Sequence, residues 1–262
     1  MKQNTPDVIL SLTTIPGAVG LAIKTLRSIF VGSVLPDKIV LYLTASQFPD
    51  GIPEELEKLK QECGLLEIRM CDLPIRSYTK LVPALKEFPD DIVVTIDDDV
   101  NYHKKMLADL LRLHKQYPDY VIANRAKRIA PEKPYKKWHK YHWYDYLRRR
   151  LRVGYGNLLT GVGGVLYPPH VLKEEMIDPQ LFMETAPTAD DIWFWAAAVA
   201  NDRKIVQVPY GVNRPKGFGK PRELTLKWGN FKAGVDRNKQ VFEAILKSYP
   251  EIRQKLEDER KG

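Results

Sequence analysis

Three consecutive aspartates, Asp97, Asp98 and Asp99, directly follow an apolar, largely β-branched run at 92–96. Carboxylates this close repel one another, so a cation, hydrogen bonds or raised pKa values must offset the cost. Hard oxygen ligands favour Mg2+ or Mn2+, and the ion would be shared with a substrate phosphate because Mg2+ takes only one or two protein carboxylates. The alternative is a solvated acidic turn with one aspartate capping the next helix. Such a turn needs only one or two acidic residues, so three favour a metal or phosphate site.

A second acidic pair, Asp190 and Asp191, opens a helix expected from 188 to 201. Thr188 and Asp191 have the spacing of a capping box, so one interpretation is that Asp191 caps its own helix. That interpretation leaves Asp190 without a role. The positive end of a helix also stabilises a charged carboxylate, which would keep a catalytic base at Asp191 deprotonated at neutral pH.

The elements that position these residues alternate between strand and helix. Strands are expected at 8–14, 38–44, 66–71 and 92–96, and helices at 19–30, 53–63, 78–88 and 104–117. This alternation predicts an α/β fold with right-handed crossovers and a mostly parallel central sheet with helices on both faces. The ends of the first, third and fourth strands then converge on one sheet edge, where such sheets bind ligands. Alternation along the fourth strand directs Asp97 and Asp99 to one side and Asp98 to the other.

The second half of the chain is less regular. Further strands are expected at 121–126, 161–167 and 205–208, and a last helix at 235–261. No linker or internal repeat divides the sequence, so residues 1–262 are expected to form a single domain. Its expected parts are a nucleotide-binding half at 1–100, an acceptor-side half at 101–210, and a loop with the C-terminal helix at 211–262.

The composition of the chain limits the kinds of partner and the location that we expect for it. The 262 residues carry 41 Lys and Arg against 33 Asp and Glu, a net charge of +8 that favours anionic partners. No apolar run is long enough to span a bilayer and no signal-peptide pattern opens the chain. The two cysteines have no metal-ligand pattern around them and are expected to be free thiols. A cytoplasmic protein is expected, with a possible peripheral position at the inner face of the membrane.

Basic and aromatic residues interleave from 125 to 152. Three interpretations stay open for this basic-aromatic segment. It can be a solvated charged face. It can bind a lipid-linked acceptor and an anionic membrane surface, since basic clusters gain roughly 1 kcal/mol per residue there and Trp and Tyr prefer the interface. It can bind nucleic acid by stacking and phosphate contacts, although we do not expect a nucleic-acid partner.

Taken together, these motifs resemble a GT-A glycosyltransferase, most closely the family-2-like enzymes of bacterial surface-polysaccharide assembly. The resemblance covers roughly residues 8–210. It depends on the strand-helix alternation, the strand that ends in the Asp triplet, the small-residue stretch at 160–166 and the acidic pair in Thr-Ala-Asp-Asp-Ile-Trp-Phe-Trp. It implies transfer of a sugar from a nucleotide-sugar donor to a glycan or lipid-linked acceptor, with Mn2+ or Mg2+ as cofactor.

The resemblance also implies roles for particular residues. Asp97 and Asp99 match the Asp-x-Asp motif that holds the divalent cation and ribose, and Asp191 matches the base of inverting members, with Asp190 supporting it. The other expected nucleotide-sugar-binding residues are Thr13, Asp72, Lys80, Asp98, Gly163 and Gly164; the two glycines would leave room for donor sugar and acceptor. Many metal-dependent relatives add a later histidine, but the last one here is His170. Water and diphosphate complete the coordination, or a residue of the loop at 210–219 does, or the metal is weakly held. That loop contains Asn213, Arg214, Lys216, Gly217 and Gly219, which suit a mobile lid gripping phosphates, and a plain surface loop is the equal alternative.

Two rival functions remain at this stage. A strand ending in Asp-x-Asp-x-Val also resembles the nucleophile motif of haloacid-dehalogenase-like phosphohydrolases, with Asp97 forming an aspartyl-phosphate. That motif normally lies on an early strand, whereas three strand-helix units precede it here. The third possibility is a non-catalytic RNA-binding or membrane-binding module built on residues 125–152.

Overall fold

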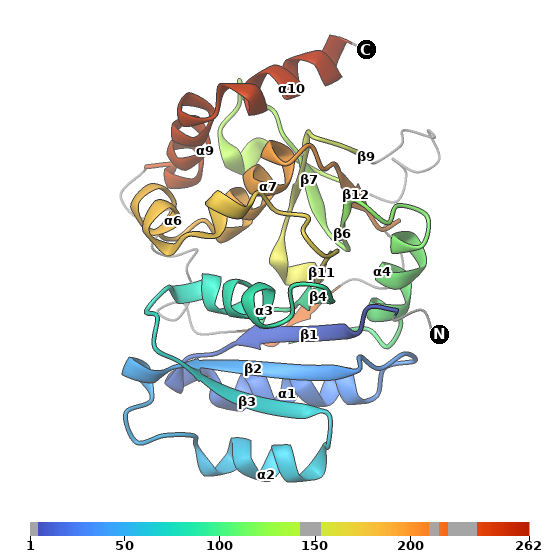
Figure 1. The fold of residues 1–262 in the computed structure, drawn as a ribbon, viewed down its shortest axis with the longest axis vertical. Helices are drawn as coiled ribbons and strands as arrows, with labels where there is room; N and C mark the ends of the chain where they lie inside the picture. Colours follow the sequence, from blue (N-terminus) through green and yellow to red (C-terminus); the bar gives the residue numbers. More distant parts are fainter. Residues whose placement is uncertain (1–4, 142–152, 210–214, 220–234, 262) are drawn as a thin grey trace.

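The computed structural model describes residues 5–141, 153–209, 215–219 and 235–261. Its central sheet has eight strands in the order β3-β2-β1-β4-β11-β6-β12-β9 (Figure 1). Only β11 and β9 run antiparallel to their neighbours, so the sheet is mostly parallel, as predicted. The strands are β1 (Val8–Thr13), β2 (Lys38–Thr44), β3 (Leu66–Cys71), β4 (Ile92–Thr95), β6 (Val121–Ala123), β9 (Val153–Gly154), β11 (Val165–Tyr167) and β12 (Ile205–Gln207).

Two hydrophobic cores cover the two faces of this sheet. Successive residues of β1 alternate between them: Ile9 lies in one core, and Leu10 and Leu12 lie in the other. The first core includes residues of α3 (Val82–Glu87), α7 (Asp190–Ala200), α9 (Arg237–Ser248) and α10 (Pro250–Lys261); the second includes residues of α1 (Val19–Phe30), α2 (Glu54–Glu62) and α4 (Met106–His114). Strands buried on both faces need the apolar, β-branched composition seen here.

Four predicted elements differ in detail. The strand expected at 121–126 is divided into β6 and β7 (Ala126–Arg128), which belong to different sheets. The helix expected at 78–88 is a 3-10 turn, η3 (Arg76–Lys80), followed by α3. The strand expected at 161–167 begins with a 3-10 turn, η5 (Gly161–Gly163), before β11. The single C-terminal helix is two helices, because Tyr249 leaves the helical conformation and Pro250 opens α10.

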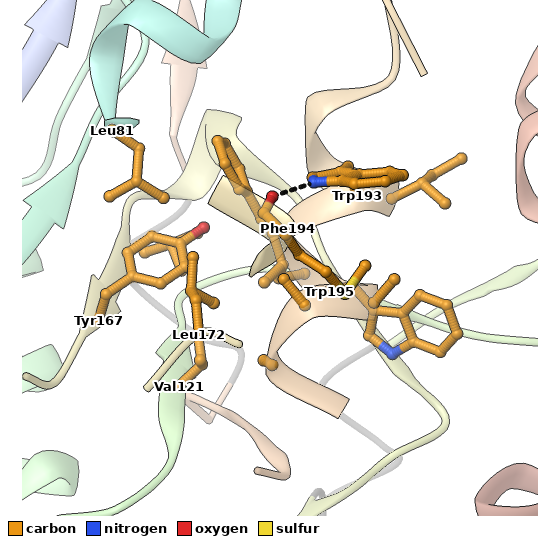
Figure 2. Close-up of a cluster of buried hydrophobic side chains, with 14 of the residues drawn as sticks. Leu81, Val121, Tyr167, Leu172, Trp193, Phe194 and Trp195 are labelled. Carbon is orange, nitrogen blue, oxygen red and sulfur yellow. Dashed lines mark hydrogen bonds between the residues drawn. The ribbon is translucent and has the colours of Figure 1, made fainter. Parts of the chain in front are cut away.

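Helix α7 lies in the middle of its core and is apolar on nearly all sides (Figure 2). Its indole groups are buried yet satisfied: Trp193 Nε1 donates to the carbonyl of Met176 at 2.7 Å, and Trp195 Nε1 donates to that of Tyr155 at 2.7 Å. Residues Ile192 to Val199 are all buried. The packing therefore fixes the position of the helix, and with it the acidic pair at its first turn.

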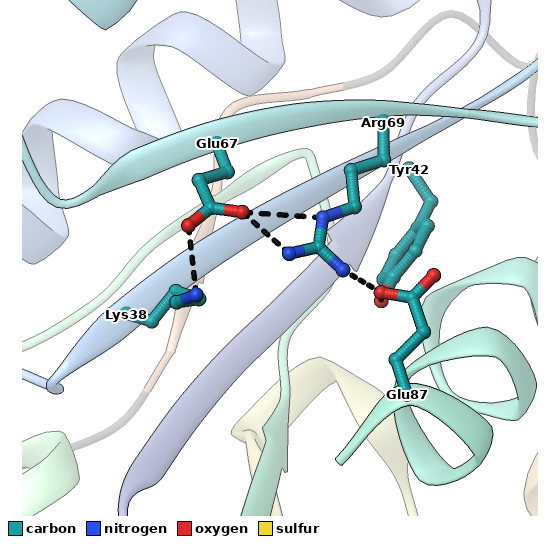
Figure 3. Close-up of polar contacts among 5 residues, drawn as sticks. All are labelled: Lys38, Tyr42, Glu67, Arg69 and Glu87. Carbon is teal, nitrogen blue, oxygen red and sulfur yellow. Dashed lines mark hydrogen bonds and ion pairs between the residues drawn. The ribbon is translucent and has the colours of Figure 1, made fainter.

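A polar network ties the edge of the sheet to α3 (Figure 3). Glu67 of β3 pairs with Lys38 at 2.8 Å and with Arg69, and Arg69 also pairs with Glu87 of α3. The hydroxyl of Tyr42 in β2 donates to the same Glu87 carboxylate at 3.0 Å. These contacts hold the helix that follows η3 against the strands, and η3 carries Lys80.

Two smaller sheets lie beside the main one. One contains β10 (Asn157–Leu159), β7 (Ala126–Arg128) and β8 (His139–Lys140) in that order, and the other contains β13 (Lys216–Gly217) and β5 (Val100–Asn101). Within the described ranges, every helix is too short or too polar to cross a membrane.

Candidate active site

The carboxyl ends of β1 and β4 bring the Asp triplet against the threonines that follow β1. Ser11 is the register partner of Thr95, so the two chains leave the sheet side by side. The Thr14 hydroxyl donates to Asp98 Oδ2 at 2.7 Å, and Thr25 of α1 donates to the Asp98 carbonyl at 2.9 Å. Asp98 is buried, whereas Asp97 and Asp99 keep part of their surface exposed, as the alternation predicted. These contacts give Asp98 a structural role in shaping the turn.

Both the backbone and the side chain of Asp97 are held by polar contacts. Its backbone N–H donates to the buried Tyr102 hydroxyl at 3.0 Å, and that hydroxyl donates to the Val162 carbonyl at 3.3 Å. Its Oδ1 atom lies 2.9 Å from the ammonium of Lys80. Tyr102 fixes the position of Asp97, and no feature of the sequence distinguishes it from an ordinary core tyrosine.

Lys80 joins the Asp triplet to the second acidic cluster. Its ammonium lies 3.0 Å from Asp190 Oδ2, and both side chains are less than a tenth exposed. The Ser11 hydroxyl donates to the Lys80 carbonyl at 2.6 Å, which fixes the backbone of η3. Burial alone would lower the pKa of Lys80, but the charges of Asp190, Asp97 and Asp191 together raise it well above its ordinary value. Lys80 is paired with two carboxylates, and the expectation that it lies near a phosphate stays a prediction.

Asp191 does not cap its own helix through the expected capping box. Ala189 occupies the N-cap position of α7, and Asp191 Oδ1 accepts a hydrogen bond from the Gly161 N–H at 3.0 Å. Burial, followed by the charge of Asp190, raises the pKa of Asp191 to about 7, against the opposing effects of Lys80 and the Gly161 N–H. The expectation that the helix terminus would keep Asp191 firmly charged is therefore wrong in direction. A carboxylate with a pKa near neutrality is nevertheless well matched to proton abstraction at neutral pH.

Gly161 is where the charged groups converge. A Cβ on this residue would lie 2.8 Å from Lys80 Nζ, 3.1 Å from Asp97 Oδ1 and 3.2 Å from Asp191 Oδ1. All three distances are shorter than ordinary van der Waals contact, so a side chain at this position would displace Lys80 and crowd the two carboxylates. Gly161 lies inside the small-residue stretch, but the sequence alone favoured its neighbours.

Gly163 and Gly164 are constrained by packing. A Cβ on Gly163 would lie 2.9 Å from the backbone N of Arg125, and one on Gly164 would lie 3.1 Å from the sulfur of Met106. Gly164 also has φ = 85°, a left-handed conformation that favours glycine. Both glycines therefore have a structural reason to be small, and room for a sugar beside them stays a prediction.

The two residues expected to hold the nucleoside lie apart on the same edge. The Thr13 hydroxyl donates to the Tyr42 carbonyl of β2 at 2.9 Å, while Asp72 is exposed after β3. Strand β2 lies between β1 and β3, so the two residues are separated across the sheet by two strand spacings, roughly 10 Å. A surface hollow of about 460 Å³ lies nearby, lined by Val19, Ile23 and residues 47–53. It contains none of the charged groups above, and we assign it no part in the reaction.

The carboxylates of the Asp triplet fit a hard divalent cation only if ligands from outside the protein complete its coordination. Asp97 and Asp99 supply partly exposed carboxylate oxygens, but the described residues contain no group of three His, Cys, Asp or Glu side chains able to hold a metal ion. Mg2+ and Mn2+ commonly take their remaining ligands from water and substrate phosphates. The residues present therefore fit a cation that arrives with, or is completed by, a phosphorylated substrate.

Part of the loop expected to act as a lid does reach the Asp triplet. Lys216 and Gly217 pair with Asn101 and Val100, and the Phe218 N–H donates to the Asp99 carbonyl at 2.8 Å. Asn213 and Arg214, which were expected to grip phosphates, lie outside the described residues.

The described part of the basic-aromatic segment corrects one expectation. Trp138 and Tyr141 are buried, Trp138 packs against Phe242, and the Tyr141 hydroxyl donates to Asn157 at 2.6 Å. These two aromatic side chains belong to the fold and cannot insert into a membrane. Residues 142–152 lie outside the described ranges.

Comparison with known proteins identifies the family and the fold. A sequence-family model described as glycosyl transferase family 2 matches residues 21–166, and no protein of curated function matches the chain. Glucosyl-3-phosphoglycerate synthase from Mycobacterium tuberculosis, solved with Mn2+, UDP and glucosyl-3-phosphoglycerate, is similar at 16% identity and a TM-score of 0.51, over 94% of this chain and 80% of that one. The mannosyltransferase PcManGT from Pyrobaculum calidifontis, solved with GDP-Man and Mn2+, has 15% identity and a TM-score of 0.55, over 99% and 76%. TarS 1-349 from S. aureus has 14% identity and a TM-score of 0.52, over 91% and 69%.

Proposed function

The chain belongs to glycosyl transferase family 2, with the GT-A fold of a nucleotide-sugar glycosyltransferase, and from this premise we propose that it is an inverting, divalent-metal-dependent enzyme with Asp191 as its base. The proposed metal ligands are Asp97 and Asp99. The proposed acceptor is a glycan or a lipid-linked glycan of surface-polysaccharide assembly.

The observation that carries this proposal is the convergence on Gly161. Asp97 and Asp191 are 94 residues apart in the chain, and yet a carboxylate oxygen of each lies within 3.2 Å of one point beside that glycine. An inverting transfer needs charge neutralisation on the leaving-group side of sugar C1 and a base on the opposite side. Two separate carboxylate clusters at one site support this division of work.

The chain's own groups have distinct tasks in this mechanism. Asp191 takes the proton from the acceptor hydroxyl as that oxygen attacks C1. The Gly161 N–H orients the Asp191 carboxylate through Oδ1, which leaves Oδ2 for the proton. Lys80 is a positioning residue that holds Asp97 and Asp190 in place. A divalent cation, when bound, would neutralise the diphosphate leaving group as a Lewis acid.

The remaining assignments are part of the same proposal. Thr13 and Asp72 hold the nucleoside at the edge formed by β1 to β3. Peripheral contact with an anionic membrane through exposed lysines of the basic-aromatic segment is a further proposal, and it no longer relies on Trp138 or Tyr141.

The first test is thermal melting of the purified protein with UDP-, GDP-, dTDP- and CMP-sugars, each in Mn2+, Mg2+ and EDTA. A ligand that binds only the native state raises the melting temperature. We expect a shift with one nucleotide class that EDTA abolishes. No shift with any donor would overturn the proposal.

Two variants then separate the roles, with the surface variant Asp258→Asn as the control. Asp99→Ala should lose the metal-dependent shift, because it removes a carboxylate from the Asp-x-Asp motif. Asp191→Asn should keep the shift and lose transfer, because it removes only the base. Full transfer by Asp191→Asn would remove the base assignment.

A further variant, Asp97→Asn, addresses the phosphohydrolase alternative. Membership of glycosyl transferase family 2 does not support a phosphohydrolase, and Asp97 follows the fourth strand in chain order and is ion-paired with Lys80. Phosphatase activity that is lost in Asp97→Asn, in a protein that binds no sugar nucleotide, would revive it.

A further inference from the structure

Basic residues gather at the small sheet formed by β10, β7 and β8. Lys127 of β7 lies directly opposite Lys140 of β8 in the antiparallel register. Arg125 lies in the bend just before β7, and its charge acts on Lys127. Like charges in directly opposite positions destabilise a sheet, so this arrangement has no structural advantage of its own.

Lys127 is the most unusual of the three. It is only 7% exposed, its ammonium lies 3.5 Å from the centre of the Tyr135 ring, and no carboxylate of the described residues lies within ion-pair distance of it. Burial, with the charges of Lys140 and Arg125, lowers the pKa of Lys127 to about 8, against the opposing charges of Asp191 and Asp236. Buried lysines are normally paired, so within the described residues Lys127 is a buried cation without an anionic partner.

A short hydrogen-bonded path joins these cations to the proposed base. The Thr160 N–H donates to the Arg125 carbonyl at 3.0 Å, and the next residue, Gly161, donates its N–H to Asp191. Lys127 follows Arg125 by two residues, and its ammonium lies over the Tyr135 ring. A base in an inverting transfer must be on the acceptor side of the sugar, and cations grouped around it therefore face the acceptor.

We propose that Arg125, Lys127 and Lys140 bind a phosphate group carried by the acceptor, close to the hydroxyl that Asp191 deprotonates. The proposal rests on the proposed function and adds to it a class of acceptor: a phosphate ester. The Arg125 guanidinium can contact two phosphate oxygens at once, and the two ammonium groups supply point charges. Both a soluble sugar phosphate and a prenyl-linked phosphate present this chemistry.

The test measures binding of inorganic phosphate by titration calorimetry at constant ionic strength, with chloride replaced by phosphate. Lys127→Met removes the buried cation and keeps the length of the side chain. Arg128→Gln is the matched control, because Arg128 is exposed on the opposite face of the same strand and its replacement changes the net charge equally. We expect Lys127→Met to weaken phosphate binding at least tenfold and Arg128→Gln to change it less than twofold. Equal phosphate binding by wild type and Lys127→Met would overturn the proposal.

Two further arms complete the test. The first arm compares glucose 1-phosphate with a prenyl phosphate in detergent micelles in the same titration. The ligand that binds more tightly, and that loses affinity in Lys127→Met, identifies the source of the phosphate. The nucleotide-sugar melting shift, measured on the same variants, should be unchanged in Lys127→Met. Loss of that shift would assign the cations to the donor and overturn the acceptor role. A donor shift without Lys127-dependent phosphate binding would overturn only the phosphate site, whereas no donor shift in the wild type would overturn the proposed function itself.

Discussion

Replacing Asp191 by Asn should stabilise the protein above neutral pH while it removes the proposed base. The pKa of Asp191 is raised from 3.8 to about 7, so between these values the native state binds a proton that the unfolded state has released. A raised pKa contributes stability that is complete below the unfolded-state value and is lost as pH rises through the folded-state value. Asparagine keeps an oxygen that can accept the Gly161 N–H, and it carries no charge to bury.

The size of the effect follows from the shift. One pKa unit corresponds to about 1.4 kcal/mol, so wild-type stability should fall by about 2.5 kcal/mol between pH 5 and pH 8 through Asp191 alone. The Asp191→Asn substitution removes this loss. The stability of the variant relative to wild type should therefore rise by about the same amount, on the order of 2.5 kcal/mol, over that interval.

The assay is urea unfolding of wild type and Asp191→Asn at pH 5, 6, 7 and 8 in metal-free buffer. Asp258→Asn, a surface substitution in α10, should show no comparable trend. A stability difference between Asp191→Asn and wild type that stays constant with pH would refute the assigned pKa. Destabilisation by Asp191→Asn at pH 8 would refute the inference that the charged carboxylate is a burden on the fold.

Three other perturbations test the geometry around Gly161. Gly161→Ala should lower the turnover number at least tenfold because its Cβ would displace the charged groups, whereas Gly20→Ala in α1, where a Cβ meets nothing within 4 Å, should leave turnover unchanged. Tyr102→Phe should cost about 1 to 3 kcal/mol in urea unfolding, because it leaves the buried Asp97 N–H without its acceptor; an unchanged midpoint would contradict the role of that hydroxyl. Lys80→Met should cost roughly 3 to 5 kcal/mol at pH 8, because it leaves buried carboxylates without their cation, and less at pH 5, where Asp191, with a pKa of about 7, is protonated; a pH-independent loss would count against the charge argument.

The sequence predicts the first half of the fold well because its signals are local. Strands β1 to β4 are apolar runs that end at turn residues, and their burial on both faces follows from their composition. The later elements were harder to predict. The break at Tyr249 and the 3-10 turn before β11 depend on local backbone geometry, and β11 runs antiparallel between β4 and β6, which the strand-helix alternation does not reveal.

The residues of the candidate site also fall into two groups, those that the sequence reveals and those that only the structure reveals. Clusters of one residue type, such as the Asp triplet and the pair Asp190 and Asp191, are visible in the sequence because several carboxylates together are costly. Residues that act by position are not visible: Gly161 is one of several glycines, and Lys127 is one of several lysines, until the strands place each beside Asp191. Their significance comes from contacts between segments far apart in the chain.

The distribution of charge around Lys80 favours a catalytic explanation over a structural one. Buried charges are expensive to desolvate, and a buried ion pair is weak evidence for stability. Here the ammonium contacts Asp97 and Asp190 directly, whereas Asp191 lies outside ion-pair distance of Lys80, and burial with the charge of Asp190 raises its pKa to about 7. A carboxylate whose pKa lies near neutrality suits the proton transfer proposed for Asp191. If Lys80 served only to stabilise the fold, an apolar cluster would do so at lower cost in free energy. A purely stabilising role also gives no reason for a neighbouring carboxylate to have a pKa near neutrality.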